Sequence, residues 1–149
     1  MDAKRYRVVL ADDNKAMRDA LAEHLGPEFV LVRSVTDGRA LVDAALETAP
    51  DIGIIDISMP IMNGIAAATE IMSRGSAMKI VFLTVNEDSD FVRAAFEAGG
   101  SAYVVKRRMA TDLAKALDAV LKGQVFISPD CNLTHSIKVK TSGSPIDVP

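Results

Sequence analysis

The sequence predicts an α/β domain, a doubly wound parallel sheet of five strands with five helices distributed over its two faces. Short runs rich in β-branched residues alternate with segments whose apolar residues recur at helical spacing over residues 5–128. This alternation is typical of parallel sheets whose crossover helices cover both faces. A chain of 149 residues, of which 49% are apolar, suits one such domain.

The strands and helices can be placed one after another along the chain. The strands are expected at residues 6–11, 29–35, 52–56, 79–84 and 101–106. Asp13 or Asn14 caps the first helix, which reaches about residue 25. Asp37 caps the second helix, which Pro50 ends. The other helices are expected at residues 65–72, 88–98 and 111–122.

The composition excludes several kinds of site. The single cysteine, Cys131, excludes an internal disulfide and a cysteine-based zinc site, and His24 and His135 are too few for a histidine-rich metal site. A helix that spans a bilayer needs about 20 apolar residues, and no apolar run in this chain approaches that length. Charged residues near the N-terminus interrupt the apolar segment that a signal peptide would need. The net charge of −3 does not indicate nucleic-acid binding. We therefore expect a cytoplasmic protein with no membrane partner.

Polar residues stand at the carboxyl ends of four of the predicted strands. Asp12 and Asp13 follow the first strand, and Asp56 closes the third. Thr84 ends the fourth strand and Lys106 ends the fifth. Ligands of open parallel sheets bind beyond the carboxyl ends of the strands, where the strand order reverses. If the first and third strands are neighbours there, three carboxylates meet in one cleft, with Asp56 at the exposed end of a buried strand.

Such a cluster of carboxylates requires a positive charge or a proton among them, because like charges a few ångströms apart repel one another strongly. Mg²⁺ prefers one or two carboxylates, several waters and a phosphate oxygen. Lys106 supplies a further positive charge, and the Thr84 hydroxyl can donate to an incoming anion. The pattern therefore favours a phosphoryl group beside Mg²⁺, with a carboxylate as the nucleophile.

Four segments resemble the receiver domain of bacterial two-component response regulators. They are VVLADDNKAMRDAL, IIDISMPIMNG, VFLTV and AYVVK, and the resemblance covers about residues 5–128. It implies a flavodoxin-like fold with the strand order 2-1-3-4-5. The stretch GQVFISP (123–129) is similar to the end of those receivers that precede a helix-turn-helix DNA-binding domain.

The resemblance implies that Asp56 is a phosphorylation site. It would accept a phosphoryl group from a sensor histidine kinase or a phosphotransfer protein of a phosphorelay and form an acyl phosphate. Lys106 would pair with the phosphoryl oxygens. The Mg²⁺ ligands would be Asp12, Asp13, Asp56 and the backbone carbonyl of Ser58. Such a chain is a switch in bacterial signal transduction rather than a turnover enzyme, and it catalyses at most its own phosphorylation and dephosphorylation.

The resemblance also implies how the switch operates. Thr84 would shift to bond the phosphoryl group, and the rotamer of Tyr103 would follow it. Ser58 and Asn86 would flank the approach to the phosphoryl group and tune its lifetime. The output face, through which we also expect homodimerisation, comprises the helix at 88–98, the strand at 101–106 and the helix at 111–122.

Two features depart from the family pattern. Arg107 stands where the family often has a cis-proline, and a cis Lys106–Arg107 peptide would cost about 3–4 kcal/mol. The residues after Ser128 are too few for a helix-turn-helix module. We therefore expect a receiver over residues 1–128, a disordered tail or truncated linker over 129–149, and no DNA binding through this chain.

Other interpretations stay open at this point. The chain is either a natural single-domain regulator or a receiver fragment of a DNA-binding transcriptional regulator. A Mg²⁺-dependent aspartyl-phosphate phosphatase would also place an Asp nucleophile at a strand end, but such enzymes usually have a second acid where this chain has Ser58. Taken singly, Asp12 and Asp13 could cap a helix, and Arg107 and Arg108 could be a solvated pair.

Overall fold

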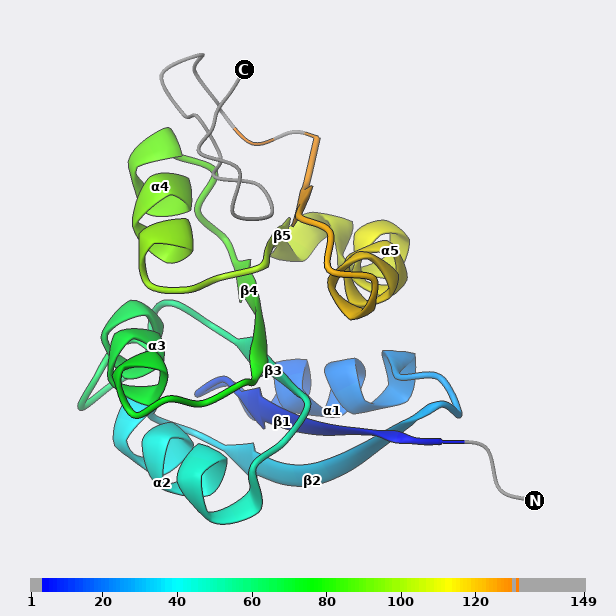
Figure 1. The fold of residues 1–149 in the computed structure, drawn as a ribbon. Coiled ribbons are helices and arrows are strands. Elements are labelled where there is room, and N and C mark those ends of the chain that lie inside the picture. The colour runs from blue at the N-terminus through cyan, green and yellow to red at the C-terminus, as the bar shows by residue number, and fades with distance from the viewer. Residues whose placement is uncertain (1–3, 130, 132–149) are drawn as a thin grey trace.

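The computed structural model describes residues 4–129 and Cys131, and it contains the expected parallel sheet with one strand more than predicted (Figure 1). The strands lie in the order β2-β1-β3-β4-β5-β6. Their bounds are β1 (Tyr6–Ala11), β2 (Phe29–Val35), β3 (Ile52–Ile55), β4 (Lys79–Thr84), β5 (Ala102–Val105) and β6 (Phe126–Ile127). The helices are α1 (Lys15–His24), α2 (Gly38–Thr48), α3 (Gly64–Ser73), α4 (Ser89–Glu97), α5 (Met109–Leu121) and the short 3-10 helix η1 (Lys106–Arg108). The doubly wound, flavodoxin-like fold is confirmed.

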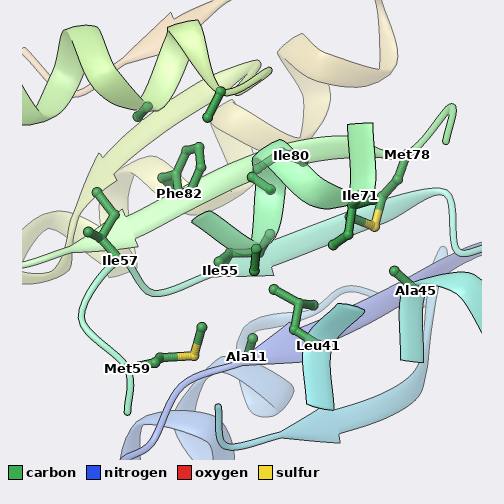
Figure 2. Packing of buried hydrophobic residues seen from close by; sticks show 14 of the residues in the cluster. Ala11, Leu41, Ala45, Ile55, Ile57, Met59, Ile71, Met78, Ile80 and Phe82 are labelled. Carbon is green, nitrogen blue, oxygen red and sulfur yellow. The ribbon is translucent and has the colours of Figure 1, made fainter. Parts of the chain in front are cut away.

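Helices cover both faces of the sheet. α1 and α5 lie on one face, and α2, α3 and α4 lie on the other (Figure 1). Each face has its own buried apolar cluster, and Figure 2 shows part of the cluster beneath α2 and α3, where Leu41 and Ile71 lie near Ile55 of the sheet. Because both faces are covered, all four residues of β3 are buried, which explains its continuous apolar sequence.

Side-chain caps fix where four of the helices begin. Asn14, Asp37, Asn63 and Asp88 each accept a hydrogen bond of 2.7–2.9 Å from a backbone N–H of the turn that follows. Each bond satisfies a donor that the helix itself leaves without a partner. Because Asn14 caps α1, the carboxylates of Asp12 and Asp13 are not needed for that role.

The last helix begins earlier than predicted. α5 begins at Met109 instead of residue 111, because it continues directly from η1 without a side-chain cap. α4 and β5 are each one residue shorter at both ends than the predicted ranges 88–98 and 101–106. No helix within the described part of the chain is both long and apolar enough to span a bilayer.

The sequence analysis did not predict β6. Phe126 and Ile127 pair with Ala102 and Tyr103. The stretch GQVFISP (123–129) therefore contributes the edge strand of the sheet beside β5. Cys131 falls within the predicted tail, yet it is only 9% exposed and belongs to the apolar cluster on the face of α2, α3 and α4. Apart from Pro129 and Cys131, the predicted tail over 129–149 lies outside the described residues.

Candidate functional site

The pairing of the strands brings the predicted site residues together. β1 pairs with β3 so that Ala11 lies opposite Ile55, and the residues that follow, Asp12 and Asp56, are therefore neighbours. The Asp56 N–H donates to the Ala11 carbonyl at 2.8 Å, which continues the pairing beyond the end of β3. Lys106 follows β5 directly and reaches both acids.

Three carboxylates and one ammonium group form the centre of the site. Lys106 Nζ lies 2.8 Å from Asp12 Oδ2 and 3.4 Å from Asp56 Oδ2. One carboxylate oxygen from each of Asp12, Asp13 and Asp56 lies within 4.8 Å of the other two. A single lysine cannot balance three carboxylates at this separation, so the site attracts a further cation.

Asp56 is more buried than the sequence analysis predicted, with an exposed fraction of 5%. The chain does not emerge into solvent after β3, because the next residue, Ile57, packs into the apolar cluster beside it. Burial raises the pKa of the Asp56 carboxyl, and the Asp12 carboxylate raises it further. Lys106 and the Ser58 N–H, which donates to Asp56 Oδ1 at 3.3 Å, lower the pKa only in part. The net pKa shift of Asp56 is upward.

The Lys106 ammonium is held in its charged form. Burial lowers its pKa, but the ion pairs with Asp12 and Asp56 outweigh burial, and the net pKa of Lys106 is raised. Its side chain is 15% exposed, so the charge is partly withdrawn from water. A fixed positive charge therefore lies beside the Asp56 carboxylate at neutral pH.

The oxygen ligands of the site fit a hard divalent cation. Asp12 Oδ2 is buried and lies 2.8 Å from Lys106 Nζ. A carboxylate oxygen carries two lone pairs, so this one can coordinate a metal ion while it also pairs with the lysine. Asp13 is exposed, which leaves the cluster open to solvent and to an entering ion.

Thr84 and Tyr103 are linked through the loop that follows β4. The Thr84 hydroxyl accepts a hydrogen bond from the Asn86 N–H at 3.3 Å, and the Tyr103 hydroxyl donates to the Asn86 carbonyl at 2.9 Å. Both side chains are fully buried, and burial raises the pKa of the Tyr103 phenol. The Tyr103 ring is therefore turned inward, and the loop residue Asn86 connects it to Thr84.

The family model for the response regulator receiver domain matches residues 8–118, about three quarters of the chain. The chain belongs to the response regulator receiver family. Its match includes Asp12, Asp13, Asp56, Thr84 and Lys106, and it ends before β6.

Known relatives of this receiver are transcriptional regulatory proteins. LiaR of Bacillus subtilis is 36% identical over 120 residues, which are 79% of this chain and 57% of LiaR. PdtaR of Mycobacterium tuberculosis is 40% identical over 113 residues, which are 75% of this chain and 55% of PdtaR. A LuxR-family two-component response regulator from Aurantimonas has a similar structure, with a TM-score of 0.81 and 32% identity over 86% of this chain and 93% of that one. The chain thus spans little more than half the length of these curated relatives.

The receiver also contains a buried ion pair that sequence reasoning missed. Arg108 donates to both carboxylate oxygens of Asp112, at 2.8 and 3.2 Å, and Asp112 is 1% exposed. Arg107 is 55% exposed and pairs with Glu87 at 2.7 Å, so the expectation of a solvated side chain agrees with the structure for Arg107. It was wrong for Arg108, whose guanidinium is partly buried against Asp112. The spacing of four residues between Arg108 and Asp112 was the available signal.

The peptide bond between Lys106 and Arg107 is trans, since the described residues contain no cis peptide bond. This outcome agrees with the energetic argument against a cis bond at a non-proline residue. The chain instead leaves β5 through the short 3-10 turn η1, which leads directly into α5.

We expect the replacement of Asp112 by Asn to change the acid sensitivity of folding. Burial raises the pKa of Asp112, but the hydrogen bonds from Arg108 and Ser128 outweigh it, and the net pKa is lowered. A lowered pKa in the folded state contributes stability above the unfolded pKa of about 4, and this contribution is lost as the pH falls through the folded-state value. The variant Asp112→Asn should therefore have a lower thermal midpoint at neutral pH, and the deficit should shrink below about pH 4.

Circular dichroism melts over this pH range measure the effect. Asp118→Asn is a matched control, because Asp118 lies on the same helix and pairs with Lys122 four residues on, but both side chains are exposed. A deficit of Asp112→Asn that stays constant into the acid range would contradict the prediction. A comparable deficit in the control would do so as well.

Proposed function

We propose that this receiver accepts a phosphoryl group on Asp56 from the phosphohistidine of a sensor histidine kinase or a phosphotransfer protein, in a reaction that requires Mg²⁺. The observation that carries the proposal is the convergence of Asp12, Asp13, Asp56 and Lys106 at the carboxyl ends of the strands. Membership of the receiver family supports the same conclusion. A related receiver, that of RcsB from Salmonella, is 26% identical and has a structure in the presence of the phosphomimetic BeF3⁻.

In the transfer, an Asp56 carboxylate oxygen attacks the phosphorus atom of the donor. The bond between phosphorus and the donor imidazole nitrogen breaks, its electron pair stays on that nitrogen, and an acyl phosphate forms on Asp56. Lys106, already 3.4 Å from Asp56 Oδ2, pairs with a phosphoryl oxygen and offsets the charge that accumulates there.

Mg²⁺ would be held by the carboxylates of Asp12, Asp13 and Asp56 together with the backbone carbonyl of Ser58. When Mg²⁺ is bound, it neutralises the crowded carboxylates and draws phosphoryl oxygens toward Asp56. The assignment is supported by the three carboxylates, each of which offers an oxygen within 4.8 Å of the other two.

Phosphorylation is then read out through the face formed by α4, β5 and α5. Thr84 shifts to bond the phosphoryl group, which changes its contact with Asn86, and the buried Tyr103 hydroxyl responds through the same loop residue. A bound phosphoryl group shifts the balance between two conformations only by preferring one of them. Ser58 and Asn86 adjust the lifetime of the acyl phosphate, and homodimerisation uses the output face.

The protein acts as a regulatory switch in the cytoplasm and not as a turnover enzyme. Its relatives are named as transcriptional regulatory proteins, but no DNA contact is assigned to the described residues of this chain. Its signal passes through protein contacts, whether it works alone or within a longer regulator.

Phosphorylation by a small donor tests the proposal. Incubation with acetyl phosphate and Mg²⁺ should give one retarded band on a phosphate-affinity gel. Chelation of Mg²⁺ by EDTA should prevent the band, and hydroxylamine, which cleaves acyl phosphates, should remove it. A band that forms equally well in EDTA, or one that resists hydroxylamine, would exclude the proposed chemistry.

A further inference from the structure

The Ser128 side chain extends the pairing at the edge of the sheet by one step. β6 pairs with β5 only as far as Tyr103 and Ile127, and the Ser128 N–H then donates to the Tyr103 carbonyl at 2.8 Å. Beyond this point β6 has ended, and the Ser128 hydroxyl accepts the Val105 N–H at 3.1 Å in place of a backbone carbonyl. Ser128 is fully buried, so this bond satisfies a donor that water does not reach.

Asp112 connects hydrogen bonds made by residues on both sides of Lys106 in the chain. The Ser128 hydroxyl donates to Asp112 Oδ2 at 2.8 Å while it accepts the Val105 N–H. The Arg108 guanidinium donates to both oxygens of the same carboxylate. Asp112 therefore fixes Val105, the residue before Lys106, through Ser128, and it fixes Arg108, two residues after Lys106, directly.

This network lies outside the carboxylate cluster, yet it holds the chain on both sides of Lys106, whose ammonium pairs with Asp12 and Asp56. Lys106 is the first residue of η1, and its carbonyl accepts the Met109 N–H that closes the turn. Its ammonium group must reach two buried acids from a turn whose peptide bond is trans. The direction of its side chain therefore depends on how firmly the end of β5 and the start of α5 are held.

We propose that Asp112 and Ser128 are positioning residues that hold the Lys106 ammonium beside Asp56 for phosphoryl transfer. The inference rests on the proposed function, in which Lys106 pairs with the phosphoryl oxygens. Neither residue touches the reacting atoms. Ser128 acts on the backbone before Lys106, and Asp112 acts on both sides of it, through Ser128 and through Arg108. Loosening the network moves the ammonium and slows the transfer, because small misplacements of a charged group cost up to about a hundredfold in rate.

Two variants loosen the network at different points. Ser128→Ala removes the acceptor of the Val105 N–H, and Asp112→Asn removes the charge that holds Arg108. Each should slow phosphorylation by acetyl phosphate about tenfold or more, with unchanged affinity for Mg²⁺ measured by calorimetry. Asp118→Asn is the control. It removes the acid of the exposed Asp118–Lys122 pair, which has the same four-residue spacing as Arg108 and Asp112, and it should leave the rate of phosphorylation unchanged. Circular dichroism establishes that each variant is folded.

A double-mutant cycle separates positioning from a general loss of structure. In a Lys106→Ala background, Ser128→Ala and Asp112→Asn should cause little further slowing, because the group that they position is absent. Full additivity of the two losses would overturn the inference, and so would unchanged rates in both single variants.

A spectroscopic measurement does not depend on phosphorylation. The ¹⁵N-ammonium signal of Lys106, assigned by its loss in Lys106→Ala, should be sharp in the parent protein and broadened in Ser128→Ala. If the parent protein is not phosphorylated but this broadening occurs, the proposed function fails while Lys106 is still held by the network. If phosphorylation proceeds and the signal is the same in the variants, only the positioning role fails.

Discussion

Replacing Asp56 with Asn should abolish phosphorylation by acetyl phosphate and, at the same time, stabilise the metal-free protein. The amide is a far weaker nucleophile than the carboxylate, so no acyl phosphate forms. The effect on stability follows from the raised pKa of Asp56, whose largest cause is burial. An acid whose pKa is raised on folding loses stability as the pH rises through that value, so at neutral pH the ionised Asp56 destabilises the fold. Asparagine carries no such charge.

Thermal unfolding in EDTA and phosphate-affinity gels measure the two effects. Asp43→Asn is the matched control, because Asp43 lies exposed on α2, away from the strand ends, and should leave both phosphorylation and stability unchanged. Addition of Mg²⁺ should narrow the difference in stability, because the ion stabilises the parent protein more than the variant. A destabilised Asp56→Asn protein, or one that is still phosphorylated at the rate of the parent, would contradict the account.

Replacing Gly64 with Ala should cause a large loss of stability. Gly64 begins α3, and a Cβ atom there would lie 2.1 Å from the Asp56 carbonyl oxygen and 2.8 Å from Ile55 Cγ2. The first of these contacts is with backbone, which cannot move aside without displacing Asp56. We expect a cost of about 3 kcal/mol or more, equivalent to a fall of roughly 10 °C in the melting temperature. Phosphorylation should slow in the molecules that remain folded.

Gly75→Ala distinguishes steric conflict from the general cost of replacing a glycine. Gly75 has a φ of +82°, but a Cβ atom there would meet nothing within 4 Å. Its replacement should cost only the about 1–2 kcal/mol of a left-handed residue. Equal melting temperatures for the two variants would show that the close approach of α3 to the Asp56 backbone does not affect stability.

The sequence was sufficient to predict the sheet and the centre of the site, because both depend on local patterns. The continuous apolar strands, the capping residues such as Asn14 and Asp37, and the order of polar residues at the strand ends are all visible in the printed chain. Once the strands are parallel, their carboxyl ends meet at one edge. The convergence of Asp12 and Asp56 then follows from the neighbouring positions of β1 and β3, and the long side chain of Lys106 reaches both acids from the end of β5.

Other features depend on tertiary contacts that no local pattern encodes. β6 is only two residues long, and it is a strand solely because it lies beside β5. Asp112 resembles an ordinary acid in the first turn of a helix, yet it is buried and accepts a hydrogen bond from Ser128, which is 16 residues away. The burial of Asp56 depends in the same way on the loop after β3 folding back over the core.

We propose that the crowded carboxylates form an acyl-phosphate site in which Asp56 is the acceptor. Borohydride reduction tests it most directly, because it converts an aspartyl phosphate to homoserine, which mass spectrometry can locate after trypsin digestion. Asp56 lies in the tryptic peptide 40–74, whereas Asp12 and Asp13 lie in the peptide 8–15. We predict homoserine at position 56 and unmodified acids in the peptide 8–15. Homoserine at Asp12 or Asp13, or phosphorylated protein with no homoserine at position 56, would contradict the account.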